Sequence, residues 1–464
     1  MDDRFTLGGS FGEEHFGAAE LGDRRRTKRL VQLADRMVMH PGGTLPEKID
    51  DPASLKALYR LMDQEEVTHA SVLTPSRERT LRLMGEAEGT VLVVQDTTEL
   101  EFTGLRSIEG LGEIGNGTCR GYLAHNALAV LAETRDVIGL AYQKLAKRPK
   151  ANKKETRQQC RERTDRLSRL WKDASASIPP AAAGRRQVEV ADRGADVLEY
   201  LDFVESQGKS YLVRSQYNRQ ICLENGETTK LHDYVRALPG QGHKTVEVPA
   251  AAQRAARTAT VSIAWAKMTL LVPKQPRGEI RGVPLTTWAI CVRETDPPAG
   301  IEPLEWILLS NVPVETVEDA WQRVGWYECR WIIEEYHKAL KTGCGVERLQ
   351  FTSEERLQPA IALISVVALF LLNLRNASRR ADAHERLATD LMPPLYVVML
   401  SLWRYKQPRN DLTVHEFYYA LARLGGHQNR KHDHLPGWLV LWRGWTKLQP
   451  MIEAATILGR QKCG

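Results

Sequence analysis

The spacing of apolar residues changes twice along the chain, and each spacing predicts a different kind of structure. Between residues 20 and 75 the apolar positions recur about every three to four residues, which is typical of helices. Leu30 and Leu33 lie on one face of the first such helix, and Asp23 is placed to cap its start. Short continuous apolar runs then predict strands, helices resume at about Thr316, and the tail from residue 381 onward is also predicted to be helical. The pattern therefore predicts an α/β protein with a helical region at each end.

The predicted strands belong to a central sheet and to an insertion in it. Residues 91–94 form a continuous apolar run, as expected of a central strand that is buried on both faces. Residues 125–132 and 137–142 predict its neighbours in an antiparallel meander. Further core strands are predicted at 188–192, 211–215 and 306–310. Residues 217–300 differ, because apolar and polar positions alternate between turns rich in Pro and Gly, and this predicts a mainly β insertion.

Two apolar segments admit more than one interpretation. The stretch 361–374 is about 14 residues long, which is short of the roughly 20 residues that span a bilayer. We therefore expect a buried core helix and no membrane association. Near the end of the chain, Trp438, Trp442 and Trp445 lie close together and predict a packed interface, either within the chain or between subunits.

The composition is that of a globular protein. The chain has 464 residues, of which 42% are hydrophobic and 26% charged, and this length predicts two to four domains. The seven cysteines are scattered without a C-x-x-C pair, so the sequence predicts neither a zinc knuckle nor a disulfide framework. Because the first residues lack the pattern of a secretory signal, we expect a cytoplasmic protein.

Positive charge is concentrated in two segments although the formal net charge is only +6. The first turns of the helix that begins after Asp23 carry Arg24, Arg25, Arg26, Lys28 and Arg29. Cations at a helix N-terminus oppose the macrodipole, so helix stability is not the obvious purpose of these residues. The phosphate backbone of a nucleic acid would supply the missing counter-charge. The alternative is a solvated basic face.

The second basic segment spans residues 144–169. It contains eleven Lys or Arg residues and three acids, Glu155, Glu162 and Asp165. We expect it to become a helix that ends near Trp171 and to offer a surface to a phosphate backbone.

Three acidic residues at distinctive positions predict a metal site. Asp96 and Asp192 each close an apolar run and are expected at strand ends, while Glu334 lies in a helical segment. Two strand-end aspartates and a helical glutamate can form an all-oxygen site for hard divalent cations of the kind used in phosphodiester chemistry.

The segment around Glu334 has a polar stripe of its own. On a helix with about 100° per residue, Arg330, Glu334 and Lys341 all lie within about 60° of Tyr327. The opposite face would supply the packing and consists of Cys329, Ile332, Ile333, Tyr336, Ala339 and Leu340. A solvated surface with an Arg330–Glu334 pair is the alternative interpretation of the stripe.

Together these segments resemble a known family. The chain resembles the DDE transposases of the bacterial insertion-sequence-four family, and within it the Tn-five transposase group. The resemblance covers about residues 15–375 and is most specific in Tyr327-x-x-Arg330-x-x-x-Glu334-x-x-x-x-x-x-Lys341. Other matching segments are Leu21-Gly-Asp-Arg, Val94-Gln-Asp96-Thr-Thr, Ala191-Asp192-Arg-Gly-Ala-Asp196, Leu212-Val-Arg214-Ser and Trp306-Ile-Leu-Leu-Ser. One position departs from the group's pattern, because Gly194 stands where the group has Glu.

The resemblance implies a domain organisation. It implies a helical DNA-recognition domain at 1–75, an RNase H-like catalytic domain at 76–375 with a β insertion at about 217–300, and a helical dimerisation domain at 376–464. Asp96, Asp192 and Glu334 would hold two Mg²⁺ ions, with Mn²⁺ as a substitute. Because three clustered carboxylates repel each other, we expect the site to be poorly ordered without metal.

The resemblance also assigns roles to residues around the three acids. Tyr327, Arg330 and Lys341 would contact phosphates near the cleaved end, and Arg214 would be a further contact. Trp306 would stack on a base that flips out when the transposon end forms a hairpin; an ordinary core tryptophan is the alternative.

The implied activity is that of a cut-and-paste transposase. It would bind the terminal inverted repeats of its element, cleave the DNA through a hairpin and join the 3′ ends to target DNA, acting as a homodimer in the bacterial nucleoid. Two other classes remain open: a catalytically silent transposase-derived regulator, which has no reason to keep the three acids, and a stand-alone structure-selective nuclease.

Overall fold

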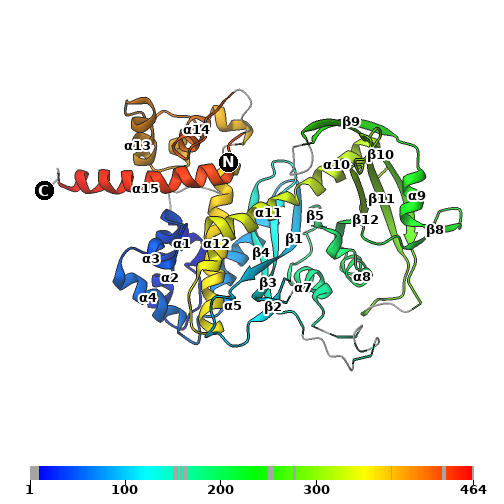
Figure 1. Cartoon of the computed structure of the whole chain (residues 1–464), viewed down its shortest axis with the longest axis horizontal. Helices are drawn as coiled ribbons and strands as arrows, with labels where there is room; N and C mark the ends of the chain where they lie inside the picture. The colour runs from blue at the N-terminus through cyan, green and yellow to red at the C-terminus, as the bar shows by residue number, and fades with distance from the viewer. Residues whose placement is uncertain are drawn as a thin grey trace.

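The structure is a computed structural model in which one large sheet runs through the molecule and helices pack along it (Figure 1). It describes residues 10–115, 117–149, 155–156, 159, 162–163, 165–248, 255–274, 278–377, 379–430 and 435–461. The N-terminal and C-terminal helices lie at one end of the molecule, and the β insertion lies at the other (Figure 1).

The N-terminal region is helical, as the apolar spacing predicts. Its helices are α1 (Phe11–Phe16), α2 (Arg24–Met39), α3 (Leu45–Lys48), α4 (Pro52–Met62) and α5 (His69–Glu86). Asp23 caps α2, because its carboxylate accepts a hydrogen bond from the Arg25 N–H at 2.8 Å. Leu30 and Leu33 are buried on the inner face of α2. Helix α5 runs without interruption through residues 75 and 76, where we expected two domains to meet.

The core sheet combines an antiparallel half with a parallel half. Its strands are β1 (Thr90–Glu101), β2 (Gly112–Ile114), β3 (Cys119–Leu131), β4 (Val137–Ala146), β5 (Arg186–Ala191) and β6 (Ser210–Arg214). Strands β1, β3 and β4 form the predicted antiparallel meander, whereas β5 lies parallel to β1 and β6 parallel to β5. The spatial order β4-β3-β1-β5-β6 is consistent with an RNase H-like core.

The insertion continues the core sheet. It contains β7 (Gln220–Cys222), β8 (Thr228–Lys230), β9 (Gly242–Val248), β10 (Arg257–Leu270) and β11 (Leu285–Glu294), with one helix, α9 (Leu231–Ala237). Strand β12 (Glu305–Ser310) returns beside β6, and β11 pairs with β12 in antiparallel register. The prediction of a mainly β segment is therefore correct, and together with β12 its strands extend the core sheet, which has twelve strands within the described residues.

Helices cover both faces of the sheet. Leu92 and Val94 pack on the side of α10 (Val317–Glu328), α11 (Trp331–Lys338) and α12 (Glu354–Ala377). Alternate strand residues face opposite sides, so Val91 and Val93 join a separate cluster with Ile178. The second face is covered by α7 (Leu170–Ser177) and α8 (Leu198–Ser206), preceded by the 3₁₀ turns η1 (Leu167–Arg169) and η2 (Arg193–Ala195). A helix ending near Trp171 was the wrong expectation, because α7 begins at Leu170 and β4 extends into the basic segment as far as Ala146.

Helix α12 is a core helix, as predicted. Among the described residues it is the one helix that is long and apolar enough to cross a membrane, and 83% of its apolar window is buried inside the fold. It contacts α5 and β4 on one side and the C-terminal α15 (Trp438–Gln461) on another. The remaining C-terminal elements are η5 (Ala381–His384), η6 (Ala388–Asp390), α13 (Pro394–Tyr405) and α14 (Val414–Leu424).

The C-terminal tryptophans pack within the chain. Trp445 is fully buried, and its indole N–H donates a hydrogen bond to the Val38 carbonyl of α2 at 3.1 Å. Its ring also contacts Phe370 of α12 and Tyr396 of α13. Of the two interpretations of this aromatic segment, packing within the chain is therefore the one that Trp445 fulfils.

Candidate active site

The first two acids lie side by side because of the strand register. The parallel pairing of β1 and β5 ends at Gln95 and Ala191, so Asp96 and Asp192 both follow the last paired residues. Asp192 stands just beyond the end of β5, as predicted. Asp96 does not end its strand, because β1 continues to Glu101 while it remains paired with β3.

Asp192 is held by the turn that follows β5. Its Oδ1 accepts a hydrogen bond from the Gly194 N–H at 2.9 Å, which caps the 3₁₀ turn η2. A Cβ atom at position 194 would meet the ring of Trp171 at 2.8 Å. The departure from the family pattern therefore has a physical reason, because Trp171 of α7 leaves no room for a side chain here.

Glu334 is presented by a helix that is interrupted on both sides. The chain leaves α10 at Glu328 and starts α11 at Trp331, with Arg330 as the residue that precedes α11. Helix α11 then passes into the π-turn η3 (Ala339–Gly343). The predicted packing face is buried throughout, but the π-turn changes the angular position of Lys341 from that of a regular helix.

Arg330 lies between two of the three acids. Its Nη1 is 2.8 Å from the Glu334 Oε1 and 3.7 Å from the Asp96 Oδ2, and the side chain is 13% exposed. The Arg330–Glu334 pair is therefore present, but it is part of the acidic site and not of a solvated surface. In this arrangement Arg330 is the counter-ion of the acids.

The three carboxylates share one electrostatic environment. The pKa of Asp96 is raised to about 6, first by burial and then by the negative charges of Asp192 and Glu334. The Thr97 N–H and the Arg330 guanidinium oppose this shift. An all-oxygen donor set fits Mg²⁺ or Mn²⁺, and a divalent ion would relieve the mutual repulsion. Within the described ranges, no group of three or more Asp, Glu, His or Cys side chains is arranged closely enough to hold a metal ion.

Tyr327, Trp306 and Arg214 form a group next to this site. Tyr327 is only 3% exposed, and its ring meets the ring of Trp306 edge-on at 5.1 Å. Arg214 donates a hydrogen bond to the Glu305 carbonyl at 2.9 Å, and burial lowers its pKa. Because Arg193 and Arg330 also act on Arg214 electrostatically, positive charge gathers on this side of the acids.

Lys341 has a partner that the sequence did not indicate. Its Nζ is 3.5 Å from the Oε1 of Glu347, in the 3₁₀ turn η4 (Val346–Arg348). Glu347 also accepts a hydrogen bond from the N–H of Glu101 at the end of β1. Lys341 is therefore placed toward the end of β1, and Glu347 would have to release it for a phosphate contact.

The five basic residues of α2 divide into two kinds. Arg26 pairs with Glu66 at 2.7 Å and hydrogen-bonds Gln64 and the Leu21 carbonyl, so it holds the N-terminal helices together. Arg25 binds Asp23, its own N-cap. The other three basic residues form no ion pair within the described part of the chain. They are Arg24 and Lys28, which are exposed, and Arg29, which is half-buried. These three are the better candidates for a nucleic-acid contact.

The described part of the second basic segment is largely neutralised. Its ion pairs are Lys144–Asp173, Lys147–Glu354, Arg148–Glu99, Arg163–Glu155, Arg163–Asp165 and Arg166–Glu199. Among the other members, Arg169 is described and half-buried but has no ion pair within the described residues, whereas Lys150, Lys153, Lys154, Arg157 and Arg161 lie outside them. The described part therefore offers less free positive charge than its composition indicates.

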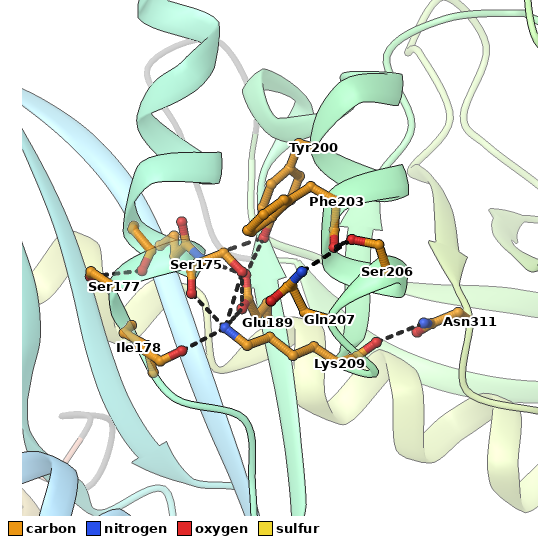
Figure 2. A network of polar contacts seen from close by, with 12 residues as sticks. Ser175, Ser177, Ile178, Glu189, Tyr200, Phe203, Ser206, Gln207, Lys209 and Asn311 are labelled. Carbon is orange, nitrogen blue, oxygen red and sulfur yellow. Dashed lines mark hydrogen bonds and ion pairs between the residues drawn. The ribbon is translucent and has the colours of Figure 1, made fainter. Parts of the chain in front are cut away.

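Sequence reasoning missed a buried polar network on the second face of the sheet (Figure 2). Glu189 of β5 is fully buried and accepts hydrogen bonds from Ser175, Tyr200 and Gln95 at 2.6, 2.7 and 2.9 Å. Lys209 lies 3.6 Å from Glu189 and donates to the Ile178 carbonyl (Figure 2). A lone Glu between two valines is typical of a half-exposed strand, so only the packing of α7 and α8 reveals this network.

Two family models match this chain. The model for a transposase DNA-binding domain matches residues 9–67, and the model for a transposase DDE domain matches residues 167–371. The first match covers α1 to α4, and the second contains Asp192 and Glu334. Together they support a DNA transposase of the DDE class, with DNA as a partner and a nuclease activity that generally uses Mg²⁺.

Proposed function

We propose, from a DNA-binding match and a DDE match on one chain, that this protein is a cut-and-paste DNA transposase whose catalytic acids are Asp96, Asp192 and Glu334. The observation that carries the proposal is the register that brings Asp96 beside Asp192, together with the common electrostatic field of the three acids. Such a protein belongs in the bacterial cytoplasm, where it meets the nucleoid.

The three acids would hold two Mg²⁺ ions, or Mn²⁺ in their place. Bound ions would activate the attacking water or 3′-hydroxyl and stabilise the leaving oxygen. Asp192 is pre-oriented by the Gly194 N–H, and Asp96 by the Thr97 N–H at 2.7 Å. Once bound divalent ions neutralise the acids in its place, Arg330 would move from the acids to a phosphate oxygen.

The neighbouring residues would position the DNA end. Arg214, Arg330 and Lys341 would bind phosphates, since a guanidinium and an ammonium are the usual phosphate partners. Tyr327 lies between Arg330 and Trp306 and would support both, while Trp306 would stack on a flipped base. Trp306 is half-buried in the free protein, so this role requires the DNA to displace its present contacts.

The proposed reaction proceeds in four steps. Water attacks the phosphodiester bond at the transposon end, and the 3′-hydroxyl leaves. That hydroxyl attacks the phosphodiester bond of the opposite strand, forms a hairpin and displaces the 3′-hydroxyl of the flanking DNA; water then hydrolyses the hairpin bond and frees the transposon 3′-hydroxyl again. The freed 3′-hydroxyl finally attacks a phosphodiester bond of the target DNA and displaces a target 3′-hydroxyl. The N-terminal domain, residues 1–75, would recognise the terminal inverted repeats, and the C-terminal domain, residues 376–464, would pair two copies.

The proposal is tested with a plasmid that carries the DNA flanking the gene on both sides, where the inverted repeats are expected. We expect Asp192→Asn and Glu334→Gln to reduce Mg²⁺-dependent nicking more than about 100-fold, since even residues that only support a metal ligand change activity by about 10–100-fold. The matched control is Glu335→Gln, which changes the neighbouring acid on α11 and is expected to keep the parental rate.

The alternative, a catalytically silent regulator, makes the opposite prediction. It would bind the same ends, but the parent protein would leave them uncut in Mg²⁺ and in Mn²⁺. The full set of acids and the DDE match argue against it. A stand-alone nuclease would cut without end specificity and would not need residues 9–67.

A further inference from the structure

A second chain of buried polar side chains crosses the molecule on the face of the sheet that carries the acids. It consists of His69, Gln143, Asn126 and His337, which we call the polar relay. These residues come from four elements, α5, β4, β3 and α11, that are far apart in the sequence. Figure 1 shows these elements next to each other in the middle of the molecule.

All hydrogen bonds between members of the relay run in the same donor-to-acceptor direction, from His69 to His337. The His69 Nε2 lies 3.0 Å from the Gln143 Oε1 and must donate, because that oxygen can only accept. The Gln143 Nε2 donates to the Asn126 Oδ1 at 2.8 Å and to the Ser365 Oγ at 2.9 Å. The Asn126 Nδ2 then donates to the His337 Nε2 at 3.1 Å.

Three of the four members of the relay are buried, and the fourth, His69, is half-buried. Asn126 is fully buried, and Gln143 and His337 are 6% and 7% exposed. Each link satisfies a polar group that would otherwise be buried without a partner, so breaking one link is costly. His337 can accept only while it is neutral, and burial keeps it so by lowering its pKa to about 3.

One end of the relay links the strand that carries the first acid to the helix that carries the third. Asn126 is the cross-strand partner of Asp96 in the β1–β3 ladder. His337 lies on α11 one turn after Glu334. The Asn126–His337 hydrogen bond therefore connects the strand of Asp96 directly to the helix of Glu334, without contacting either carboxylate.

The other end of the relay lies next to the segment that the DNA-binding family model matches. His69 is the first residue of α5 and follows the matched residues 9–67 almost directly. Thr68 caps α5, because its hydroxyl accepts a hydrogen bond from the Ser71 N–H. A shift of the N-terminal helices would therefore move His69 and, through it, Gln143.

We propose that the polar relay is a positioning device that sets Glu334 relative to Asp96 and couples this distance to the N-terminal domain. The inference rests on the proposed function, because it assumes that the three acids bind a divalent ion. Its members act through Glu334 and are positioning residues.

The test is Mn²⁺ binding to the full-length protein without DNA, followed by electron paramagnetic resonance of the free ion. We expect His337→Met to weaken Mn²⁺ binding by about 10-fold or more, as is typical when a residue that supports a metal ligand is lost. His337→Gln offers an amide oxygen near the position of Nε2, which can accept from Asn126, and should bind Mn²⁺ within about 3-fold of the parent.

A matched control separates positioning from simple loss of stability. Tyr211→Phe removes a buried hydrogen bond of 2.6 Å to Thr287 in a different core cluster. It should lower the unfolding temperature like His337→Met and leave Mn²⁺ binding unchanged. Equal Mn²⁺ binding by His337→Met and the parent would overturn the inference and leave the proposed function standing.

Two further variants complete the test. If His337→Met does not fold, His69→Phe at the half-buried end takes its place, with an expected several-fold loss of Mn²⁺ affinity; parental affinity would overturn the coupling. If Glu334→Gln binds Mn²⁺ as tightly as the parent, the metal site itself is wrong, and the proposed function fails independently of the relay.

Discussion

At the scale of single residues, the surroundings of Asp96 disfavour its charged form. It is mostly buried, it faces two other carboxylates, and only Arg330 and one N–H group offset their repulsion. An acid whose pKa is higher in the folded protein than in the unfolded chain destabilises the fold at pH values where it is ionised. The site therefore stores repulsion that a divalent cation would release.

Replacing Asp96 with Asn should accordingly stabilise the metal-free protein. With a folded pKa of about 6 against an ordinary value of 3.8, the cost of ionisation is absent below pH 3.8 and complete above pH 6. The gain at pH 7 amounts to about 3 kcal/mol. Thermal unfolding in EDTA at pH 7 and at pH 4 checks this, since the advantage of Asp96→Asn should nearly vanish at pH 4. A lower unfolding temperature for Asp96→Asn at pH 7 would contradict it.

Gly194 supports a second prediction at this scale. Gly194→Ala should destabilise the protein by about 1–3 kcal/mol, because its Cβ would collide with the Trp171 ring at 2.8 Å. The collision should also shift Asp192 and weaken Mn²⁺ binding, which calorimetry measures. Gly104→Ala is the matched control, because a Cβ there meets nothing within 4 Å. Trp171→Leu should partly rescue the Gly194→Ala variant.

At the scale of elements, α2 shows that neighbouring basic residues can have different roles. Arg26 points to acids and carbonyls of its own domain, whereas Arg24 and Lys28 are exposed at the start of the same helix. The macrodipole argument applies to all of them, but Arg26 receives its counter-charge from Glu66.

Two groups of variants should therefore behave differently. Arg24→Ala and Lys28→Ala should weaken DNA binding and reduce the salt dependence of the binding constant by about 0.9 for each phosphate that is no longer neutralised. Arg26→Ala should mainly lower the unfolding temperature, because it removes three polar partners. Fluorescence anisotropy at several salt concentrations and thermal unfolding check both. Equal effects of Arg24→Ala and Arg26→Ala on both measurements would contradict this division.

The helix of Glu334 is also decided at this scale. The apolar face from Cys329 to Leu340 packs as the helical spacing predicts. Two interruptions, before Trp331 and after Lys338, could not be predicted from the same spacing. Helix α11 contacts β1, and the π-turn η3 contacts α12. The π-turn changes the angular position of Lys341 relative to Glu334 on the predicted stripe.

At the scale of the whole molecule, the two ends of the chain are joined through its core. Trp445 of α15 lies against Phe370 and Tyr396 and bonds to Val38 of α2, so the C-terminal region packs directly on the N-terminal one. Removing residues 376–464 would therefore expose a packed face of α2 and α12.

Trp445→Ala should cost about 3–5 kcal/mol, the usual loss for a fully buried Trp. Trp445→Phe should cost less, since it keeps the ring contacts and loses only the bond to Val38. The control is Trp331→Ala, which changes a Trp that is 54% exposed and should leave the unfolding temperature nearly unchanged. Chemical denaturation measures the free energy of unfolding of all three variants. A comparable loss of stability for Trp331→Ala would contradict the assignment of Trp445 as the stabilising core tryptophan.

Local chemistry alone determined a large part of this protein. The cap at Asp23, the apolar face from Cys329 to Leu340 and the central strands all depend on residues close together in the sequence. They could be predicted because spacing and capping act over one or two turns.

Only the tertiary structure decided which charges are free and which are paired. Lys147 meets Glu354 across 207 residues, and Arg26 meets Glu66 from the turn between α4 and α5. Glu189 is buried because α7 and α8 cover its face, and Asp96 lies within a strand because β3 remains paired with it. The physical reason is common to these cases. A charge or a strand end is defined by its partners, and these partners come from distant parts of the chain.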